Sequence, residues 1–300
     1  MRSLIYSFIV SAGIVAMSSC VAKNGNSGTA LEAELNEYIA GKDARIGVAV
    51  MLEGEEYAVV NGRGKFPMLS VYKFPQALAV ADYCRRNGLS FNDTLRIAAE
   101  EMLENTWSPM RDKYGVKDIA LPISELLSYT LQQSDNNACD VLFRLMGGAS
   151  VADSVMRRMG YEDIVIVSTE AEMHEDVYLC YQNHSTPIAM ARLLEQFDSD
   201  LRNREGEYAE IATLMEGCET GGDRLAGALA GDVVIGHKTG TGDRNSLGRI
   251  IGINDVGYIH LPDGRRYTVA VFIADSAADA PDTARMIADL SAIIYRHIAK

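Results

Sequence analysis

Residues 248–274 read GRIIGINDVGYIHLPDGRRYTVAVFIA and are typical of two long β-strands joined by a turn. The segments Gly248 to Leu261 and Tyr267 to Ala274 are rich in Val, Ile and Gly, and Pro262-Asp263-Gly264 between them supplies turn residues. Another strand is expected before them, over Val233 to Lys238. The C-terminal part of the chain therefore predicts an antiparallel sheet.

The N-terminal part predicts strands of the same kind. Ile46 to Leu52 and Tyr57 to Asn61 are separated by Glu53-Gly54-Glu55, which is typical of a hairpin. Apolar residues at helical spacing predict a helix over Thr29 to Ala40, and the same pattern predicts a closing helix over Pro281 to Ile298.

The middle of the chain, from about residue 70 to residue 216, is helical in pattern. The expected helices are Phe74 to Asn87, Ser124 to Thr130, Asn136 to Met146, Ser150 to Met159 and Pro187 to Phe197. This order excludes an alternating βαβ fold and predicts an α/β + α fold, an antiparallel β-sheet flanked by terminal helices with an inserted all-helical domain. We expect residues 29–66 and 217–300 in the α/β domain and residues 67–216 in the helical one, with a ligand cleft between them.

The first residues are typical of an export signal rather than of the fold. Arg2 is followed by an apolar segment, Leu4 to Met17, which is too short to span a bilayer. Ser18-Ser19-Cys20 then places small residues before a cysteine, as in bacterial lipoprotein signals. We expect residues 1–20 to be a signal peptide, Cys20 to take the lipid, and residues 21–28 to be a flexible tether. The expected location is the periplasm, and simple secretion is the alternative.

Composition excludes some functions. The 300 residues are 48% hydrophobic with a formal net charge of −13, and no stripe of Lys and Arg is present, which argues against nucleic-acid binding. The five histidines do not have the HxH or HExxH spacing of a zinc site, so neither a metal nor another cofactor is expected. Four cysteines after Cys20, none in CxxC spacing, are expected as free thiols, with one disulfide as the alternative: Cys84, Cys139, Cys180 and Cys218.

Three short motifs can carry chemistry. Ser70-Val71-Tyr72-Lys73 places a hydroxyl and an amine three residues apart at the start of a predicted helix, where the lysine can activate the serine. Ser134-Asp135-Asn136 separates two predicted helices, and by itself is more typical of a turn with a helix cap than of a catalytic site. Lys238-Thr239-Gly240 ends a predicted strand, where it would place positive charge, a hydroxyl and closely approaching backbone along one edge.

In this order and context, the three motifs resemble the class A serine β-lactamases over essentially the whole mature chain. The resemblance implies that Ser70 is acylated, that Lys73 assists its deprotonation and that Ser134 protonates the leaving lactam nitrogen. It also implies that Lys238 holds the Ser134 hydroxyl and the substrate carboxylate, and that Asn136 binds the amide of the substrate's side chain.

The resemblance assigns further roles near the end of the predicted strand. The backbone N–H groups of Ser70 and Thr241 would form the oxyanion hole, and Thr239 and Gly240 would contact the substrate. His237, directly before Lys238, is expected to be structural.

The segment Thr169-Glu170-Ala171-Glu172-Met173-His174 separates a hydrolase from a transpeptidase. An acyl-enzyme is released only if a base directs water onto it, and Glu170 matches the deacylating Glu of the family. Glu172 is a rival for that role. His174 stands where the family has Asn, so it would have to hold the water through a ring nitrogen.

Two more positions are expected at the substrate. The family's Arg after Lys-Thr-Gly is replaced here by Leu247, and Arg224 matches a site where some members carry that Arg instead; the alternative for Arg224 is a surface or structural ion pair. Trp107 matches an aromatic residue at the cleft rim, and the alternative is a core position.

The resemblance therefore implies a monomeric serine β-lactamase that confers antibiotic resistance, acts on penicillins and cephalosporins with a preference for cephalosporins, and needs no cofactor. Its partner is the β-lactam, and it meets the membrane only through the lipid anchor. Whether Lys73 or Glu170, through water, takes the Ser70 proton is left open. The rival functions are a penicillin-binding D,D-peptidase and a sensor lipoprotein that stays acylated.

Overall fold

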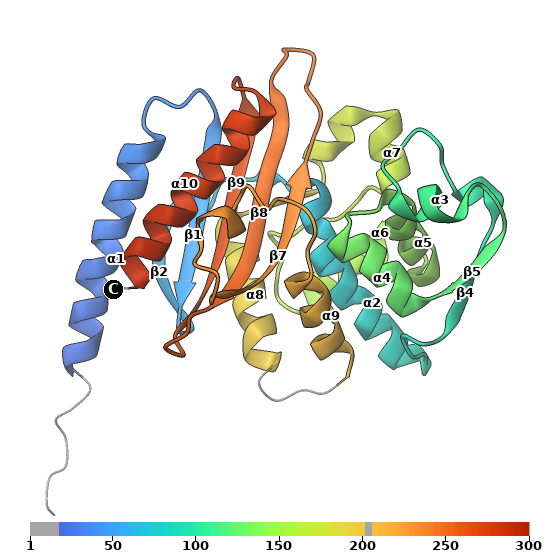
Figure 1. The fold of residues 1–300 in the computed structure, drawn as a ribbon, viewed down its shortest axis with the longest axis horizontal. Helices are drawn as coiled ribbons and strands as arrows, with labels where there is room; N and C mark the ends of the chain where they lie inside the picture. The colour runs from blue at the N-terminus through green and yellow to red at the C-terminus, as the bar shows by residue number, and fades with distance from the viewer. Residues whose placement is uncertain (1–17, 202–205, 300) are drawn as a thin grey trace, which may run out of the picture.

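The structure is a computed structural model that describes residues 18–201 and 206–299 (Figure 1). At its centre is a five-stranded antiparallel sheet in the order β2-β1-β9-β8-β7. Its strands are β1 (Arg45–Leu52), β2 (Glu55–Val60), β7 (Val234–Thr241), β8 (Ile250–His260) and β9 (Arg266–Ser276). Both ends of the chain thus contribute to one sheet, which confirms the predicted fold class.

Alternation along the central strands gives the sheet two apolar faces. In β1, Val48 and Val50 pack with the terminal helices α1 (Ser18–Ile39) and α10 (Ala280–Ile298), whereas Ala49 and Met51 belong to the cluster on the other side. Successive side chains of a strand point to opposite faces, so a sheet covered on both sides needs apolar residues at almost every position. This explains the continuous apolar runs that predict these strands.

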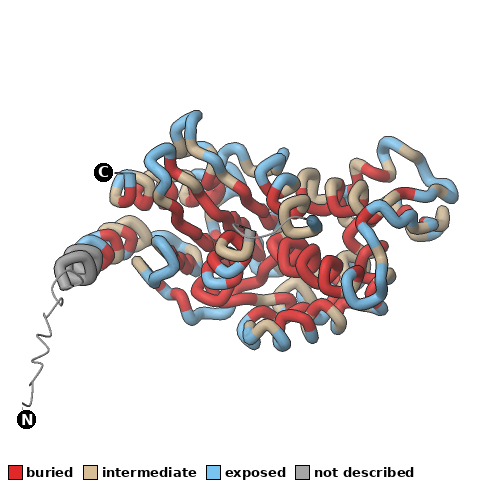
Figure 2. Tube along the Cα trace, turned by 90° about the horizontal axis from the view of Figure 1, so that it is seen from below, coloured by how far each residue is buried: buried red, intermediate tan, exposed pale blue. Residues whose placement is uncertain are grey.

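The helical region follows β2 and precedes β7. Its helices are α2 (Lys73–Asn87), α3 (Pro109–Tyr114), α4 (Ile123–Gln132), α5 (Asn136–Met146), α6 (Ala149–Arg158), α7 (Glu170–Glu175), α8 (Pro187–Leu201) and α9 (Glu207–Glu216). Helix α8 lies against β1, β8 and β9, so the sheet is a layer between α8 and the terminal helices (Figure 1). The buried interior is continuous from the sheet into the helical region (Figure 2). The domain boundaries at residues 66 and 217 stay a prediction.

Short elements that the periodicity does not predict connect these helices. They are the two-stranded ribbons β3 (Phe66–Pro67) with β6 (His184–Ser185) and β4 (Thr94–Ile97) with β5 (Ile119–Pro122), and the 3₁₀ turns η1 (Leu69–Tyr72), η2 (Ala99–Glu101), η3 (Val177–Tyr181) and η4 (Ala226–Ala228). Elements this short are fixed by their contacts rather than by a repeating apolar pattern.

Helix α1 differs from the prediction at its start. It begins at Ser18 rather than at Thr29, so residues 21–28, for which the sequence predicts a flexible tether, are helical. Gly28 is buried where an added Cβ would lie 2.2 Å from the backbone oxygen of Tyr57 in β2, so the helix is already docked on the sheet before Thr29. Residues 1–17 of the predicted signal peptide lie outside the described residues.

The four cysteines for which side chains are described are free thiols: Cys84, Cys139, Cys180 and Cys218. Cys84 and Cys139 are buried, and Cys180 and Cys218 are only partly so. Within the described ranges, every helix is too short or too polar to cross a lipid bilayer.

Candidate active site

Ser70 lies in the 3₁₀ turn η1, directly before α2, which begins at Lys73, so the motif lies at the start of a helix as predicted. A side chain of the sheet holds the residues just before Ser70 in place. The buried Asn254 of β8 donates hydrogen bonds to the backbone oxygens of Pro67 (2.9 Å) and Met68 (3.1 Å). Leu69, next to the serine, has φ +50°, a left-handed conformation that non-glycine residues adopt only where their surroundings enforce it.

Lys73 is the centre of the polar contacts. Its Nζ is fully buried and lies 3.0 Å from Ser70 Oγ, 2.9 Å from Glu170 Oε1 and 2.6 Å from Asn136 Oδ1. It also reaches the backbone oxygen of Ser134 at 2.9 Å. A lysine ammonium has only three N–H bonds. The serine hydroxyl therefore competes with three other acceptors for these hydrogens, and it can donate its own proton to Lys73 when the amine is neutral.

Glu170 is the first residue of α7. Thr169 caps this helix by accepting a hydrogen bond from the N–H of Glu172, whose carboxylate in turn accepts one from the N–H of Thr169 at 2.8 Å. This capping box occupies Glu172, which is exposed, whereas the Glu170 carboxylate points to Lys73. Of the two rivals, only Glu170 is therefore placed beside the candidate nucleophile.

Asp140 of α5 holds the first turn of α7 by hydrogen bonds to its backbone. Its two oxygens accept hydrogen bonds from the N–H groups of Glu170 and Ala171, both at 2.8 Å. Burial and the negative charge of Glu170 raise the pKa of Asp140 to about 7. A carboxylate at a helix N-terminus also interacts favourably with the helix dipole.

The Ser134-Asp135-Asn136 segment supplies a second hydroxyl. Lys238 Nζ donates to Ser134 Oγ at 3.0 Å, and Ser134 has φ +60°. The buried Asp135 holds this conformation because its carboxylate accepts hydrogen bonds from the N–H groups of Met110 (2.7 Å) and Ala138 (2.8 Å). Burial lowers the pKa of Lys238 to about 8, with a further contribution from the charge of Lys73.

Strand β7 extends through Thr241, so Lys238-Thr239-Gly240 lies within the strand rather than at its end. A Cβ added to Gly240 would lie 2.6 Å from the backbone oxygen of Met68, so only glycine lets the strand approach the turn that carries Ser70. Thr239 Oγ1 contacts Thr220 Oγ1 at 2.6 Å. The close approach places the Thr241 backbone beside the cleft.

Arg224 is buried behind this strand. Its guanidinium donates to the backbone oxygens of Gly240 (3.1 Å) and Asn254 (2.9 Å) and to Thr241 Oγ1 (2.6 Å). Burial lowers its pKa. Arg224 also lines the cleft, so it combines a structural role with a position that can receive an anion.

The remaining predicted residues lie at the rim. Trp107 is 61% exposed and donates its indole N–H to the backbone oxygen of Gln133 at 2.9 Å, so the alternative of a core tryptophan is wrong. His174 is exposed and lines the cleft, but its ring makes no hydrogen bond to the described residues. Leu247 is 81% exposed and offers no charge.

These side chains enclose one continuous cleft made of two adjoining hollows. Both hollows share Ser70, Asn136 and Thr241. One extends to Glu170 and His174 and has a volume of about 180 Å³, whereas the other extends toward Trp107, Ser134, Thr220, Arg224 and Thr239 and has a volume of about 270 Å³. A serine nucleophile, a buried lysine, a proton-relay hydroxyl and a carboxylate thus converge in one place, which suits acyl transfer followed by hydrolysis.

Comparisons with known proteins agree with this chemistry. A family model described as the β-lactamase enzyme family matches residues 30–298. A class A β-lactamase structure from Bacteroides cellulosilyticus DSM 14838 is 35% identical, covers 91% of this chain and 98% of that one, and has a TM-score of 0.87. The chain belongs to the class A β-lactamases. It is therefore a β-lactam hydrolase of the kind that confers antibiotic resistance.

Two curated relatives match this β-lactamase over most of the length of both chains. A β-lactamase of Bacteroides uniformis is 36% identical over 94% of this chain and 96% of its own length. The extended-spectrum β-lactamase PER-1 of Pseudomonas aeruginosa is 34% identical over 89% of this chain and 86% of its own length. These comparisons confirm the predicted resemblance to the class A β-lactamases and, through the solved structure, the predicted fold.

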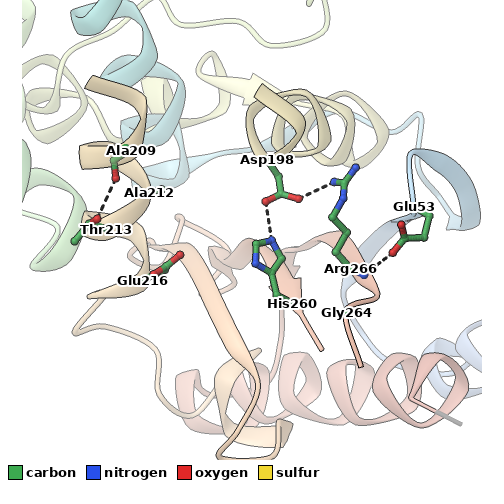
Figure 3. Close-up of a pocket in the computed structure, with 9 residues that line it drawn as sticks. All are labelled: Glu53, Asp198, Ala209, Ala212, Thr213, Glu216, His260, Gly264 and Arg266. Atoms are coloured by element: carbon green, nitrogen blue, oxygen red, sulfur yellow. Dashed lines mark hydrogen bonds and ion pairs between the residues drawn. The ribbon is translucent and has the colours of Figure 1, made fainter. Parts of the chain in front are cut away.

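The β-lactamase has a larger cavity, about 560 Å³, between α8, α9 and the turn after β8. It lies at the His260 end of β8, whereas the turn that carries Ser70 is held by Asn254, nearer the other end of that strand. Figure 3 shows the side chains of Asp198, His260 and Arg266 directed toward one another in it. The Asp198 carboxylate lies 2.7 Å from His260 Nε2 and 2.6 Å from Arg266 Nη1. These ionisable groups are already paired, and the described residues that line the cavity include no serine or cysteine, so it lacks a candidate nucleophile for the hydrolysis.

Sequence reasoning missed several residues that build the β-lactamase site. Asp140, Asn254 and Thr220 lie outside the three motifs, although Asp140 is only four residues after Asn136 and therefore near it on α5. An acidic residue one helical turn after the motif was a usable signal for Asp140. For Asn254, the only signal was its position beside Asp255 in a mostly apolar strand.

Proposed function

We propose that this β-lactamase hydrolyses the lactam amide of penicillins and cephalosporins through an acyl-enzyme on Ser70, which water activated by Glu170 releases. The observation that supports this most strongly is the position of Lys73 Nζ, 3.0 Å from Ser70 Oγ and 2.9 Å from Glu170 Oε1. One buried lysine side chain thus connects the group that is acylated to the group that deacylates.

In the proposed acylation, Ser70 Oγ attacks the lactam carbonyl carbon and loses its proton to Lys73 or, through water, to Glu170. The N–H groups of Ser70 and Thr241 stabilise the oxyanion that forms on the carbonyl oxygen. When the C–N bond breaks, Ser134 Oγ gives its proton to the lactam nitrogen. Lys238, 3.0 Å from that hydroxyl, stabilises the charge that develops on it.

In the proposed deacylation, Glu170 removes a proton from water while the water oxygen attacks the ester carbonyl. The ester C–O bond then breaks and Ser70 Oγ regains a proton. The exposed position of His174 on the cleft wall supports contact with bound water or substrate rather than a role in holding Glu170. Thr239, Gly240, Asn136, Arg224 and Trp107 form the substrate-facing walls of the proposed site.

We infer a preference for cephalosporins because the segments 134–140 and 170–174 resemble the cephalosporin-preferring branch of class A. The similarity to PER-1, which is named an extended-spectrum β-lactamase, supports it. The ratio of kcat/KM for a cephalosporin and a penicillin of matched side chain tests this preference. A higher value for the penicillin would contradict it.

We further propose that the enzyme is exported, lipid-anchored through Cys20 and monomeric. The apolar segment 4–17 followed by Ser18-Ser19-Cys20 supports the anchor. Incorporation of labelled palmitate into the full chain, and its loss in Cys20→Ser, tests the anchor and the location in the periplasm. The molar mass of the detergent-solubilised protein tests the monomer.

The central experiment compares hydrolysis of a chromogenic cephalosporin by wild type, Glu170→Ala and Glu172→Ala. We expect fast turnover in wild type and in Glu172→Ala, because Glu172 serves the helix cap. Glu170→Ala should accumulate an acyl group on Ser70 that is detectable by mass spectrometry. A wild type that gives one burst and then stops would contradict the hydrolytic role and favour a penicillin-binding peptidase or a sensor.

A further inference from the structure

A cysteine, a histidine and an aspartate form a second cluster of ionisable groups behind the Lys238 wall of the cleft. Cys218 lies just after α9. Its Sγ lies 3.4 Å from Thr220 Oγ1, which contacts Thr239 of β7, so the thiol lies near the part of β7 that carries His237 and Lys238. His237 Nδ1 lies 2.9 Å from Asp255 Oδ1 on the neighbouring strand β8. The proposed hydrolysis does not use these three side chains.

Asp255 and His237 are held firmly in this cluster. Both are buried, and the Asp255 carboxylate also accepts a hydrogen bond from the N–H of Leu225 at 3.1 Å. Burial alone lowers the pKa of His237, but the charge and hydrogen bond of Asp255 outweigh it and raise that pKa to about 10. A nucleophile beside a base that a carboxylate orients is the arrangement that activates thiols in enzymes.

Cys218 also lies near the surface. It is partly exposed between the exposed residues Gly217 and Glu219, in contrast to the buried Cys84 and Cys139. Burial raises the pKa of Cys218, but the hydrogen bond from His237 and the charges of His237 and Lys238 outweigh it and bring the pKa to about 7.

Cys180 provides a comparison within the same chain. It is partly exposed like Cys218, but burial and the negative charge of Glu170 raise its pKa to about 12. The two thiols differ mainly in their charged neighbours. Cys218 has the cations His237 and Lys238 beside it, whereas the charged neighbours of Cys180 are carboxylates.

We propose that Cys218 is a reactive thiolate and a covalent-modification site for small electrophiles and hydroperoxides, and that its modification lowers β-lactam turnover. With a hydroperoxide, the thiolate sulfur attacks the nearer peroxide oxygen and the O–O bond breaks. The sulfur loses two electrons and becomes a sulfenic acid, and the departing oxygen leaves as hydroxide or alkoxide and takes a proton from the His237 imidazolium. With a haloacetamide, an S–C bond forms and halide leaves.

Two contacts connect this thiol to the cleft. Cys218 Sγ lies 3.4 Å from Thr220 Oγ1, which lies 2.6 Å from Thr239 Oγ1 in the cleft wall. The Cys218 thiolate also supports the positive charge of the buried Lys238. An added group would displace Thr220, and an uncharged adduct would remove the negative charge. This coupling rests on the proposed roles of Thr239 and Lys238, whereas the reactivity of Cys218 does not.

The first measurement is the rate of iodoacetamide labelling of each cysteine in the native full chain, resolved by peptide mass spectrometry. A thiol of pKa about 7 has on the order of 10⁴ times more thiolate at pH 7 than one of pKa about 12, and its lower nucleophilicity removes about two of these orders. We expect Cys218 to react on the order of 100-fold faster than Cys180, with a rate that levels off above about pH 7.

The charged groups near the thiol are His237 and Lys238 from β7 and Arg224 from the loop after α9, and Asp255 from β8 acts on it through His237. His237→Gln should therefore move the midpoint of the labelling profile upward. The wild-type profile is decisive even if this variant does not fold. Labelling of Cys218 no faster than Cys180, or a midpoint above about 9, would overturn the proposal.

The second measurement follows cephalosporin hydrolysis after treatment with hydrogen peroxide. Wild type should lose turnover in step with dimedone trapping on Cys218, and Cys218→Ser should show no time-dependent loss. If Cys218 is fully modified and turnover is unchanged, the coupling to the cleft is overturned. A wild type with no turnover before treatment would instead contradict the proposed hydrolysis, which separates the two failures.

Discussion

The carboxylate of Asp140 accepts hydrogen bonds from the backbone N–H groups of Glu170 and Ala171, both at 2.8 Å. The helix that carries the candidate deacylating residue is thus attached to α5 by a side chain outside all three motifs. Because α5 also carries Asn136 and begins beside Ser134, one helix fixes the acylating and the deacylating sides of the cleft relative to each other.

We predict that Asp140→Ala slows deacylation more than acylation. The substitution leaves two N–H groups of α7 without their acceptor, and a hydrogen bond to a charged group contributes about 1.5–3 kcal/mol. Since about 1.4 kcal/mol is tenfold in rate, we expect kcat to fall tenfold or more, with an acyl group detectable on Ser70 during turnover.

Asp153→Ala is the matched control for Asp140. Asp153 of α6 also accepts a backbone hydrogen bond, from Ile166 N at 3.1 Å, but it does not contact α7. Its loss should lower the melting temperature without acyl accumulation. Equal kinetic effects of the two variants would contradict a specific role of Asp140.

The second prediction concerns Lys238 and pH. Burial and the charge of Lys73 lower the pKa of Lys238 to about 8, so the ammonium is present below that pH and lost above it. We expect kcat/KM for a carboxylate-bearing β-lactam to fall as the pH rises through about 8, by about tenfold per pH unit. The measurement is a pH profile of kcat/KM between 6 and 10.

Lys238→Arg provides the comparison, because a guanidinium keeps its charge throughout this range. The variant should have lower activity at pH 7 but no alkaline limb near 8. A limb at the same pH in both proteins would assign it to another group.

The sequence predicted the central strands and the long helices because their apolar patterns are local. The contact between Ser70 and Lys73 is also local, because the two residues are three apart. The structure places them in η1 and at the start of α2. The contacts of Asp140 with α7 and of Asn254 with the turn before Ser70 join residues far apart in the chain. The spacing of Asp140 from Asn136 indicates that it lies near the site, but no local pattern predicts which backbone groups it holds. The start of α1 was missed for the same reason, because Gly28 packs on Tyr57 of another element.

The third prediction separates the two roles of Arg224. Its guanidinium holds Gly240, Thr241 and Asn254 from behind and also lines the cleft. We expect Arg224→Ala to raise KM for anionic β-lactams about tenfold and to lower the melting temperature, because three acceptors lose their donor. The measurements are kcat, KM and thermal unfolding of each variant.

Arg244 is the control for this test. It is exposed and donates to the backbone oxygens of Gly248 and Ala278, outside the cleft. Arg244→Ala should leave KM unchanged. If Arg224→Ala lowers the melting temperature but leaves KM unchanged, Arg224 supports the strand and does not bind the substrate anion.

The last prediction concerns the ion pair of His260 and Asp198 in the cavity of Figure 3. The hydrogen bond to Asp198 raises the pKa of His260 above 6.5, and although burial raises the pKa of Asp198, the contacts with His260 and Arg266 outweigh it and lower that pKa below 3.8. The contribution of His260 to the free energy of unfolding is complete below about pH 6.5 and is lost as the pH rises through its folded pKa. The contribution of Asp198 is present above about pH 4 and is lost at lower pH.

We therefore expect His260→Gln to lower the free energy of unfolding at pH 6 and to have little effect at pH 9. The histidine side chain is 41% exposed, so the difference should not exceed about 1 kcal/mol. Urea unfolding of both proteins at the two pH values measures it. His184→Gln is the control, since the ring of His184 hydrogen-bonds to the backbone oxygen of Gln182 and forms no ion pair with a described carboxylate. Because the cavity lies away from Ser70, kcat should be the same in His260→Gln and wild type. An effect as large at pH 9 as at pH 6 would show that packing, rather than the ion pair, accounts for the stabilisation.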